Sequence, residues 1–388
     1  MIPEMHFDAV AEARPGRAWQ ARWQRSGALY LDWFTARGGL AGPSGAECAE
    51  ALAHHMPELV PVHRALTRLA GGSDNVGRFL SGWCPPPYLG GCSLAAFESG
   101  GTTRLVRNYD LSPTLNEGLL LRTEWTGTPV MAMTEFLWGV SDGINGHGLA
   151  VALAFGGTRT VGRGFGICMI LRYVLETCRD VTEARAVLDR VPSHMDYNVV
   201  LADAGGRTAS VEMHAGGGTT WRATAIATNH QLDAPLPDRA AFTRTVERRA
   251  RLSHLVAPGQ VADASAFLVP PLYQTDYAGG FGTLFTAEYV PRDRAMRLMW
   301  PDGEMVQSLD AFFPESWHVR FAQGAASQGT PVPATDMAAM IEGLLPNVPA
   351  ANREAARHWI DAAAAGRVDW AGFGQLFVPP AMHEGGAR

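Results

Sequence analysis

A predicted β-hairpin around Cys92 constrains the fold of this chain more than any other feature. The apolar run that Cys92 begins is typical of a buried strand, and residues 103–107 predict the returning strand of the hairpin. Between them, Glu98-Ser99-Gly100-Gly101 has the composition of a tight turn. With the loop centred on Ser99-Gly100, antiparallel pairing places Cys92 directly opposite Arg107, with both side chains on one face.

This hairpin would bring chemically complementary groups to one place. A guanidinium beside the Cys92 thiol favours the thiolate, which is the nucleophilic form, and Asp110 follows within reach of the Cys92 backbone. A general base is missing, but cleavage of the Gly91–Cys92 bond would create an α-amine whose ordinary pKa is near neutrality. Gly91 has no Cβ, which leaves its carbonyl open to attack. The alternative is a buried structural cysteine at the start of a strand.

Several stretches of the chain match a known family in order and spacing. Gly-Gly-Cys-Ser, followed by Arg-Asn-Tyr-Asp, resembles the start of the N-terminal-nucleophile (Ntn) hydrolases of the choloylglycine hydrolase and penicillin acyltransferase type. The resemblance is stronger to the self-cleaving acyltransferase and hydrolase branch (peptidase C45 type). Residues 143–151 are similar to the family's "G-x-N-E-x-G-L-A-V" strand, with Gly146 in place of the usual Glu. Further similar stretches are 171–184, 197–212, 227–230 and 282–286, so that the resemblance covers roughly Cys92 to Gly303.

The resemblance implies an α+β fold, a four-layer αββα Ntn sandwich with two antiparallel sheets between helical layers. Residues 1–91 would be a mainly helical propeptide, residues 92–315 the catalytic core, and residues 316–388 a helical C-terminal extension. A hydrophobic content of 47% in 388 residues allows a core of this size. From the sequence pattern we expect helices near residues 19–34, 46–56, 165–179, 182–190, 243–256, 335–345, 350–365 and 370–377.

The resemblance also implies roles for individual residues. Cys92 is the nucleophile that forms a thioester with the acyl group, and Gly91 and Cys92 flank the self-cleaved bond. Arg107 favours the thiolate and Asp110 orients the Cys92 amine. Asn229 ends an alternating strand and donates to the oxyanion, with an ordinary turn asparagine as the alternative.

Other candidate positions stay open. Arg244 and Arg248 both lie where the family has a site arginine, with a slight preference for Arg244, and a solvated helix face is the alternative for either. Backbone N–H groups near Ala154 and Phe155 are candidates to complete the oxyanion hole, although the family often has Asn at Ala154. Trp138 is a candidate wall of the substrate pocket, with core packing as the alternative.

Composition excludes several other classes of function. All 32 basic residues are Arg, so a pyridoxal Schiff base, a Walker A lysine and a lysine base are impossible. A net charge of −6 with scattered Arg argues against nucleic-acid binding. Five irregularly spaced cysteines argue against a disulfide framework, and no group has zinc-site spacing, so we expect no metal and no cofactor. Without a membrane-length apolar run or a secretory signal, we expect a cytoplasmic protein.

We therefore predict a self-cleaving N-terminal-cysteine amidohydrolase that acts on a small linear amide. Acyl transfer to an amine is the first alternative, because it uses the same thioester. A binding or assembly protein without catalysis is the second, which the departures at Gly146 and Ala154 allow. The expected partners are a small-molecule amide or acyl donor and, for transfer, an amine acceptor. The cleaved N-terminal segment should stay associated through its Trp-rich helices, and a homo-oligomer is compatible with the sequence.

Overall fold

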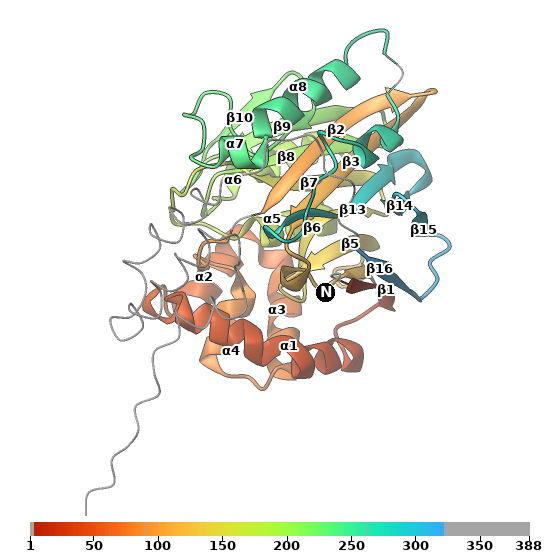
Figure 1. The fold of residues 1–388 in the computed structure, drawn as a ribbon. Helices are drawn as coiled ribbons and strands as arrows, with labels where there is room; N and C mark the ends of the chain where they lie inside the picture. The colour runs from red at the N-terminus through yellow and green to blue at the C-terminus, as the bar shows by residue number, and fades with distance from the viewer. Residues whose placement is uncertain (1–3, 89, 261, 322–388) are drawn as a thin grey trace, which may run out of the picture. The chain divides into compact units, whose positions relative to one another are not determined.

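Two β-sheets lie face to face, with helices on both outer sides (Figure 1). The structure, a computed structural model, describes residues 4–88, 90–260 and 262–321. All of them belong to the first of the chain's two units, residues 1–327. The helices expected near residues 335–345, 350–365 and 370–377 lie outside the described residues.

The larger sheet has nine strands in the order β10-β9-β8-β7-β6-β5-β4-β1-β16. Neighbouring strands are antiparallel, except that β1 and β4 are parallel. The strands are β1 (Glu4–Glu12), β4 (Leu119–Thr123), β5 (Val130–Glu135), β6 (Gly139–Asn145), β7 (Leu149–Phe155), β8 (Tyr197–Asp203), β9 (Thr208–Met213), β10 (Thr219–Arg222) and β16 (Glu315–Arg320).

The smaller sheet has seven strands, in the order β11-β2-β3-β13-β14-β15, with β12 paired to β13. All of its strand pairs are antiparallel. The strands are β2 (Gly91–Ser99), β3 (Thr102–Leu111), β11 (Ile226–Ala227), β12 (Thr275–Asp276), β13 (Phe281–Val290), β14 (Ala295–Trp300) and β15 (Gly303–Ser308).

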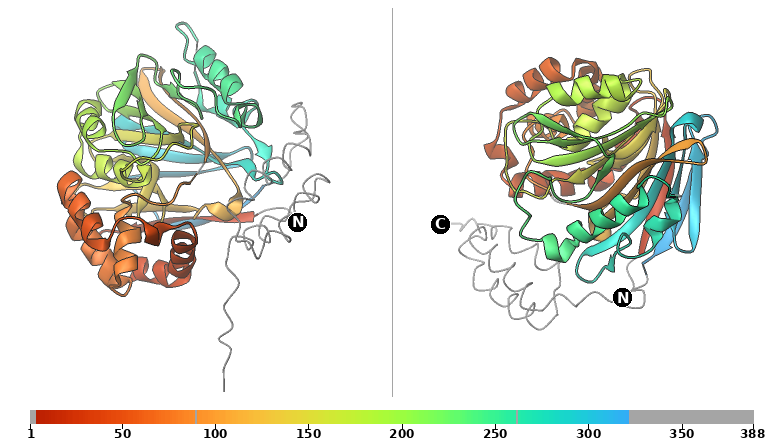
Figure 2. Two further views of the ribbon diagram at one scale, coloured as in Figure 1. Left: turned by 90° about the vertical axis from the view of Figure 1, so that its left-hand side faces the viewer. Right: turned by 90° about the horizontal axis from the view of Figure 1, so that it is seen from above.

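Side-chain alternation along the strands creates the layers. On β2, Cys92 and Leu94 point into the core between the sheets, whereas Ala95 and Phe97 point outward. The outward residues pack on α8 (Thr245–Leu255), which follows α7 (Ala240–Thr243). Helices α5 (Ile167–Thr177) and α6 (Val181–Arg190) cover the outer face of the nine-stranded sheet (Figure 2). The expected αββα arrangement is confirmed.

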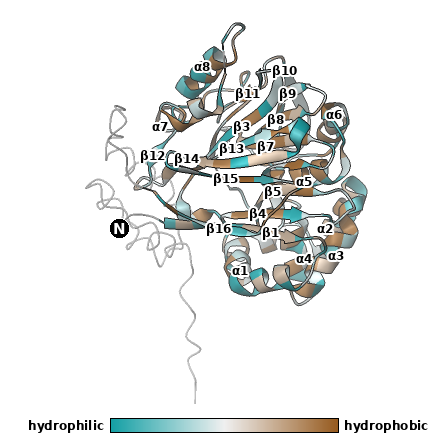
Figure 3. Cartoon of the chain, turned by 90° about the vertical axis from the view of Figure 1, so that its right-hand side faces the viewer, coloured by the Kyte–Doolittle hydropathy of each residue, from teal (hydrophilic) through white to brown (hydrophobic). Residues whose placement is uncertain are grey.

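Four more helices come from the N-terminal segment and gather beside α5 (Figures 1 and 2). They pack apolar residues into the core, and apolar and polar residues alternate along their ribbons as brown and teal in Figure 3. Ser44 and Glu47 form a capping box at the start of the second helix. The four helices are α1 (Arg17–Ala36), α2 (Gly45–His55), α3 (Val60–Leu69) and α4 (Asp74–Ser81).

Two segments differ from the sequence-based expectation. The N-terminal segment also contains β1, whose buried Met5, Phe7 and Ala9 alternate with exposed residues, a strand period that the helical prediction overlooked. The chain after Pro314 forms β16 rather than a helix at residues 315–320, because it pairs with β1. The nine-stranded sheet therefore includes residues from both sides of the expected 92–315 core.

Candidate active site

The β2–β3 hairpin forms as predicted, but with a different register. Its turn is Gly100-Gly101, where both residues have positive φ, a conformation that glycine adopts at little cost. Because the turn lies one residue later than predicted, Cys92 pairs with Tyr109 rather than with Arg107. Arg107 is instead a diagonal neighbour on the same face, and its Nη2 donates to Cys92 Sγ at 3.2 Å.

Burial and a neighbouring cation act on the Cys92 thiol in opposite directions. The side chain is inaccessible to solvent, and this burial raises the pKa of the Cys92 thiol to about 11, although Arg107 acts in the opposite direction. The expected role of Arg107 in favouring the thiolate stays a prediction; Arg107 lowers the pKa of the thiol, but burial raises it by more. A proton acceptor is needed before this thiol can act as a nucleophile.

Asn229 lies beside the backbone of Cys92. Strand β11 pairs with β2 so that Ala227 faces Leu94, and the next two residues bring Asn229 level with Cys92. The Cys92 backbone N–H donates to Asn229 Oδ1 at 3.0 Å. Asn229 Nδ2 donates to the carbonyl oxygens of Gly90 at 3.4 Å and of Phe155 at 3.3 Å. Its amide oxygen thus faces the nitrogen of Cys92, and its amide nitrogen faces the segment that precedes Gly91.

Arg248 reaches the same spot from α8. Its Nη1 donates to the Cys92 carbonyl oxygen and, at 2.8 Å, to Ser93 Oγ. Its Nη2 donates to Asn229 Oδ1 at 2.6 Å, and its Nε donates to the Thr243 carbonyl oxygen at 2.8 Å. The side chain is fully buried, and its donor fork ties the Cys92 carbonyl to Asn229 and to the Thr243 carbonyl before α8.

Arg244, which the sequence analysis slightly favoured, does not share this position. The single helix expected over 243–256 is broken, because Arg244 has a φ of 51° and separates α7 from α8. The Arg244 side chain is one-quarter exposed and pairs with Glu247 at 2.6 Å. The structure therefore places Arg248, and not Arg244, against Cys92.

Asp110 lies on the outer face of the seven-stranded sheet, opposite Gly91 in the ladder. Its Oδ1 accepts from Thr283 Oγ1 at 2.7 Å, and its Oδ2 lies 3.5 Å from Arg248 Nη1. Within the described part of the chain, Oδ2 has no hydrogen-bond partner. Burial raises the pKa of Asp110, whereas Arg248 lowers it. One acceptor atom beside the Cys92 backbone is thus left unused.

The sequence analysis missed Asp142 and Tyr289. Asp142 Oδ1 contacts Arg107 Nη1, and Tyr289 OH donates to Asp142 Oδ2 at 2.6 Å. The two residues lie on β6 and β13, in different sheets, and no local motif marks either of them. Stacking of the two sheets brings Asp142 to Arg107, whereas Tyr289 lies in the same sheet as Arg107, on the strand that pairs with β3.

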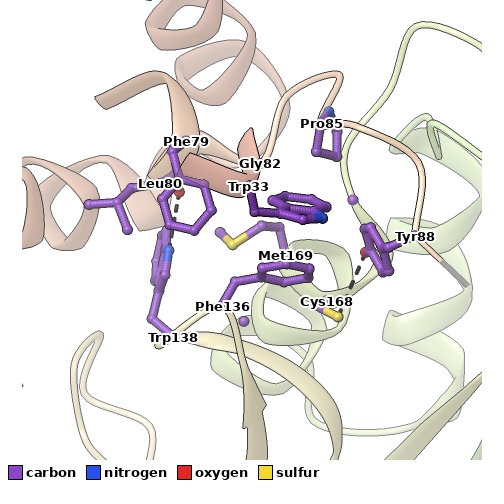
Figure 4. A pocket seen from close by; sticks show the side chains of 12 residues that line it. Trp33, Phe79, Leu80, Gly82, Pro85, Tyr88, Phe136, Trp138, Cys168 and Met169 are labelled. Atoms are coloured by element: carbon purple, nitrogen blue, oxygen red, sulfur yellow. Dashed lines mark hydrogen bonds between the residues drawn. The ribbon is translucent and has the colours of Figure 1, made fainter. Parts of the chain in front are cut away.

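The other predicted positions divide between two places. Ala154 is buried between the sheets, and the Phe155 carbonyl accepts from Asn229. Trp138 instead lines a cavity of about 30 Å³ between the N-terminal helices and α5, and its Nε1 donates to the Leu80 carbonyl oxygen at 3.1 Å (Figure 4). Cys92 does not line this cavity, whose other walls include Trp33, Phe79, Tyr88, Phe136, Cys168 and Met169 (Figure 4).

The described ranges contain neither a metal site nor a membrane-spanning helix. No cluster of His, Cys, Asp and Glu among residues 4–88, 90–260 and 262–321 has the arrangement of a metal site. In the same ranges, no helix is both long and apolar enough to cross a membrane.

The chain resembles known proteins in sequence and in fold. The sequence model of the family "acyl-coenzyme A:6-aminopenicillanic acid acyl-transferase" matches residues 97–304, more than half of the chain, beginning just after Cys92. No curated protein matches. Three solved structures are similar at low sequence identity. A mutant of the conjugated bile acid hydrolase of Clostridium perfringens is 12% identical, with 61% of this chain and 99% of that chain covered and a TM-score of 0.40. The penicillin V acylase of Agrobacterium tumefaciens (16% identity, 59% of this chain and 86% of that chain, TM-score 0.37) and the N-acylethanolamine-hydrolyzing acid amidase ortholog of Caenorhabditis elegans (16% identity, 59% of this chain and 99% of that chain, TM-score 0.38) are similar too. The chain belongs to the acyl-coenzyme A:6-aminopenicillanic acid acyl-transferase family, within the Ntn acyltransferases and hydrolases.

Proposed function

We propose that this protein cuts itself between Gly91 and Cys92 and then hydrolyses a small linear amide through a thioester on Cys92. The observation that carries the proposal is the set of side chains around this cysteine: Arg107, Asp110, Asn229 and Arg248. Each is at most 3% exposed, and each contacts the thiol, the backbone or a residue that holds them. Burying polar groups costs free energy unless they are hydrogen-bonded or paired. Here four such groups converge on one potential nucleophile, which is typical of a functional site.

In the cleavage step, the amine that leaves Gly91 is the acceptor for the thiol proton. Attack of Cys92 Sγ on the Gly91 carbonyl would convert the peptide bond to a thioester, with the thiol proton passing to the released amine. Water then hydrolyses the thioester, leaving a carboxylate on Gly91 and both a thiol and an α-amine on Cys92. An α-amine has an ordinary pKa of about 8, so it supplies the base that the intact site lacks.

Acceptors for this amine are already in place. Asn229 Oδ1 accepts from the Cys92 nitrogen in the intact chain. Asp110 Oδ2, which has no hydrogen-bond partner among the described residues, offers a second acceptor with negative charge. Together they would hold the amine beside the thiol in the orientation that proton transfer requires.

The catalytic cycle follows from the same groups. The α-amine takes the thiol proton, and the thiolate attacks the substrate carbonyl. Asn229 Nδ2, released from Gly90 when the preceding segment moves away, donates to the oxyanion. The C–N bond breaks, the α-ammonium protonates the leaving amine, and a thioester remains. Water, deprotonated by the α-amine, releases the acid and restores the thiol.

Acyl transfer is the second candidate, because the matching family is named for an acyltransferase. The thioester would then pass to an amine instead of water, and the outcome depends on whether the acceptor site excludes water. Incubating the enzyme with an N-acyl substrate and a competing amine distinguishes the two. Preferential acylation of the amine at modest concentration would replace hydrolysis with transfer.

Intact-mass analysis of the purified enzyme tests the proposal directly. We expect two associated pieces, one ending at Gly91 and one beginning at Cys92, and Cys92→Ala should remain uncut. Cys178→Ala is the matched control, because Cys178 is another buried free cysteine outside the site. A single uncut species in active enzyme would contradict self-cleavage.

The rate of thiol alkylation distinguishes an enzyme from a binding protein. A Cys92 thiol that iodoacetamide modifies no faster than an ordinary exposed thiol would favour a binding protein.

A further inference from the structure

A buried ion pair connects the two sheets immediately behind Cys92. Arg107 on β3 and Asp142 on β6 are both fully buried, and Arg107 Nη1 contacts Asp142 Oδ1. The other end of the same guanidinium, Nη2, donates to Cys92 Sγ at 3.2 Å. One planar group therefore bridges a carboxylate on one sheet and the candidate nucleophile on the other.

Asp142 is itself firmly held. Ser141 Oγ donates to Asp142 Oδ1 at 2.7 Å, and Tyr289 OH donates to Oδ2 at 2.6 Å. On the other side, the Tyr109 ring lies 4.1 Å from the Arg107 guanidinium carbon and covers its face. These contacts hold the Arg107 guanidinium with Nη2 on the sulfur.

We propose that Asp142 is a positioning residue for the Cys92 chemistry, holding Arg107 against the sulfur and balancing its positive charge. This inference rests on the proposed function of Cys92. A buried cation without a counterion would lower the pKa of the neighbouring thiol, because an opposite charge within hydrogen-bonding distance favours the ionised thiolate. Paired with Asp142, Arg107 supplies a fixed donor with little net charge, so the thiol keeps its proton until the amine leaving in the cleavage step, and later the free α-amine, takes it up.

Other ionisable groups also face this pair and bear on any pH measurement. Burial raises the pKa of Glu135 to about 8, and Glu135 accepts from Tyr109 OH at 2.7 Å, one side chain away from Arg107. The groups that act on Cys92 or Arg107 are Tyr109 and Asp110 on β3, Glu135 on β5, Asp142 on β6, Cys168 on α5, Arg248 on α8 and Tyr289 on β13.

The pH dependence of Cys92 alkylation tests the proposal without requiring a known substrate. Mass spectrometry of the Cys92 peptide measures iodoacetamide labelling at each pH. The wild type and the variant are compared in the same cleavage state, either both cut or both uncut. Asp142→Asn keeps the shape of the side chain but removes its charge. We expect it to move the alkylation midpoint to lower pH by about one unit or more. A midpoint equal to that of the wild type would overturn the proposal.

A double-mutant cycle separates this effect from a general structural disturbance. In an Arg107→Gln background, Asp142→Asn should no longer move the midpoint, because its effect acts through the guanidinium. A shift that persists without Arg107 would refute the assignment. Glu135→Gln is the control for the other carboxyl near Arg107, and a shift as large as that of Asp142→Asn would equally refute it.

Two further comparisons keep the test decisive. If Asp142→Asn does not fold, Tyr289→Phe replaces it, because it loosens Asp142 but keeps its charge. We then expect slower Cys92 alkylation at an unchanged midpoint, and an unchanged rate would overturn the proposal. The two proposals can fail separately. If the wild type neither cuts itself nor hydrolyses amides, but Asp142→Asn still shifts the alkylation midpoint, only the proposed function is refuted. If the wild type cuts itself normally but Asp142→Asn does not shift the midpoint, only the role of Asp142 is refuted.

Discussion

Replacing Arg248 by alanine should be far more damaging than replacing Arg244, although the two residues are four apart in sequence. Arg248 is fully buried and contacts the Cys92 carbonyl, Asn229 Oδ1 and Asp110 Oδ2. Its removal leaves Asp110 as a buried charge without its cation, and breaking a buried pair in this way costs about 3–5 kcal/mol. Arg244 is paired with Glu247 at the surface, where such pairs contribute about 0–1 kcal/mol.

Urea denaturation followed by tryptophan fluorescence measures this difference, and intact-mass analysis measures self-cleavage in the same samples. We expect Arg248→Ala to lose about 3–5 kcal/mol of unfolding free energy and to cut slowly or not at all. Arg244→Ala should resemble the wild type in both assays. Arg248→Lys, which keeps the charge but not the fork of donors, should fall between them. Equal stability of the two alanine variants would refute the reasoning.

Three further predictions concern other positions. Gly91→Ala should slow self-cleavage and destabilise the fold by about 1–3 kcal/mol, because a Cβ there would lie 2.3 Å from the Phe281 ring. Gly90→Ala is the control for both measurements, since a Cβ at Gly90 would have no neighbour nearer than 3.6 Å. Because the pKa of Glu135 rises from 4.5 to about 8 in the folded protein, its contribution to stability is present below pH 4.5 and is lost as the pH rises through 8. The thermal midpoint should therefore fall less between pH 5 and pH 8 in Glu135→Gln than in the wild type, and an equal fall would count against this assignment. Asn229→Ala should lower turnover about 100-fold to 1000-fold by removing an oxyanion donor, whereas full activity would exclude Asn229 from the mechanism.

Local pattern predicted several of the elements but not their precise alignment. The hydrophobic periodicity gave α1, α2, α5 and α6 and the two strands of the Cys92 hairpin. The hairpin turn was displaced by one residue, because Ser99-Gly100 and Gly100-Gly101 are both reasonable turns and only the packed sheet selects between them. The prediction that Cys92 and Arg107 share one face of the hairpin was still correct, because a shift of the partner by two residues preserves side-chain direction.

Features that depend on tertiary structure could not be predicted in this way. The break at Arg244 decides which arginine faces Cys92, and helical periodicity treats 243–256 as continuous. Asp142 and Tyr289 are 35 and 182 residues from Arg107 in the sequence, so only the stacking of the sheets and the pairing of β3 with β13 show that they meet. Strand β1 was overlooked because its partners, β4 and β16, are both distant along the chain.

The position of β1 also bears on how the protein is made. This strand lies between β4 and β16, with more than 300 residues separating it from β16 in sequence. During synthesis β1 can pair with β4 early, but its second edge remains open until residues 315–320 have left the ribosome. Such late, long-range pairing is slow, and an open strand edge is a template for association with other chains. A chain shortened before residue 315 would keep that edge permanently open and should therefore aggregate.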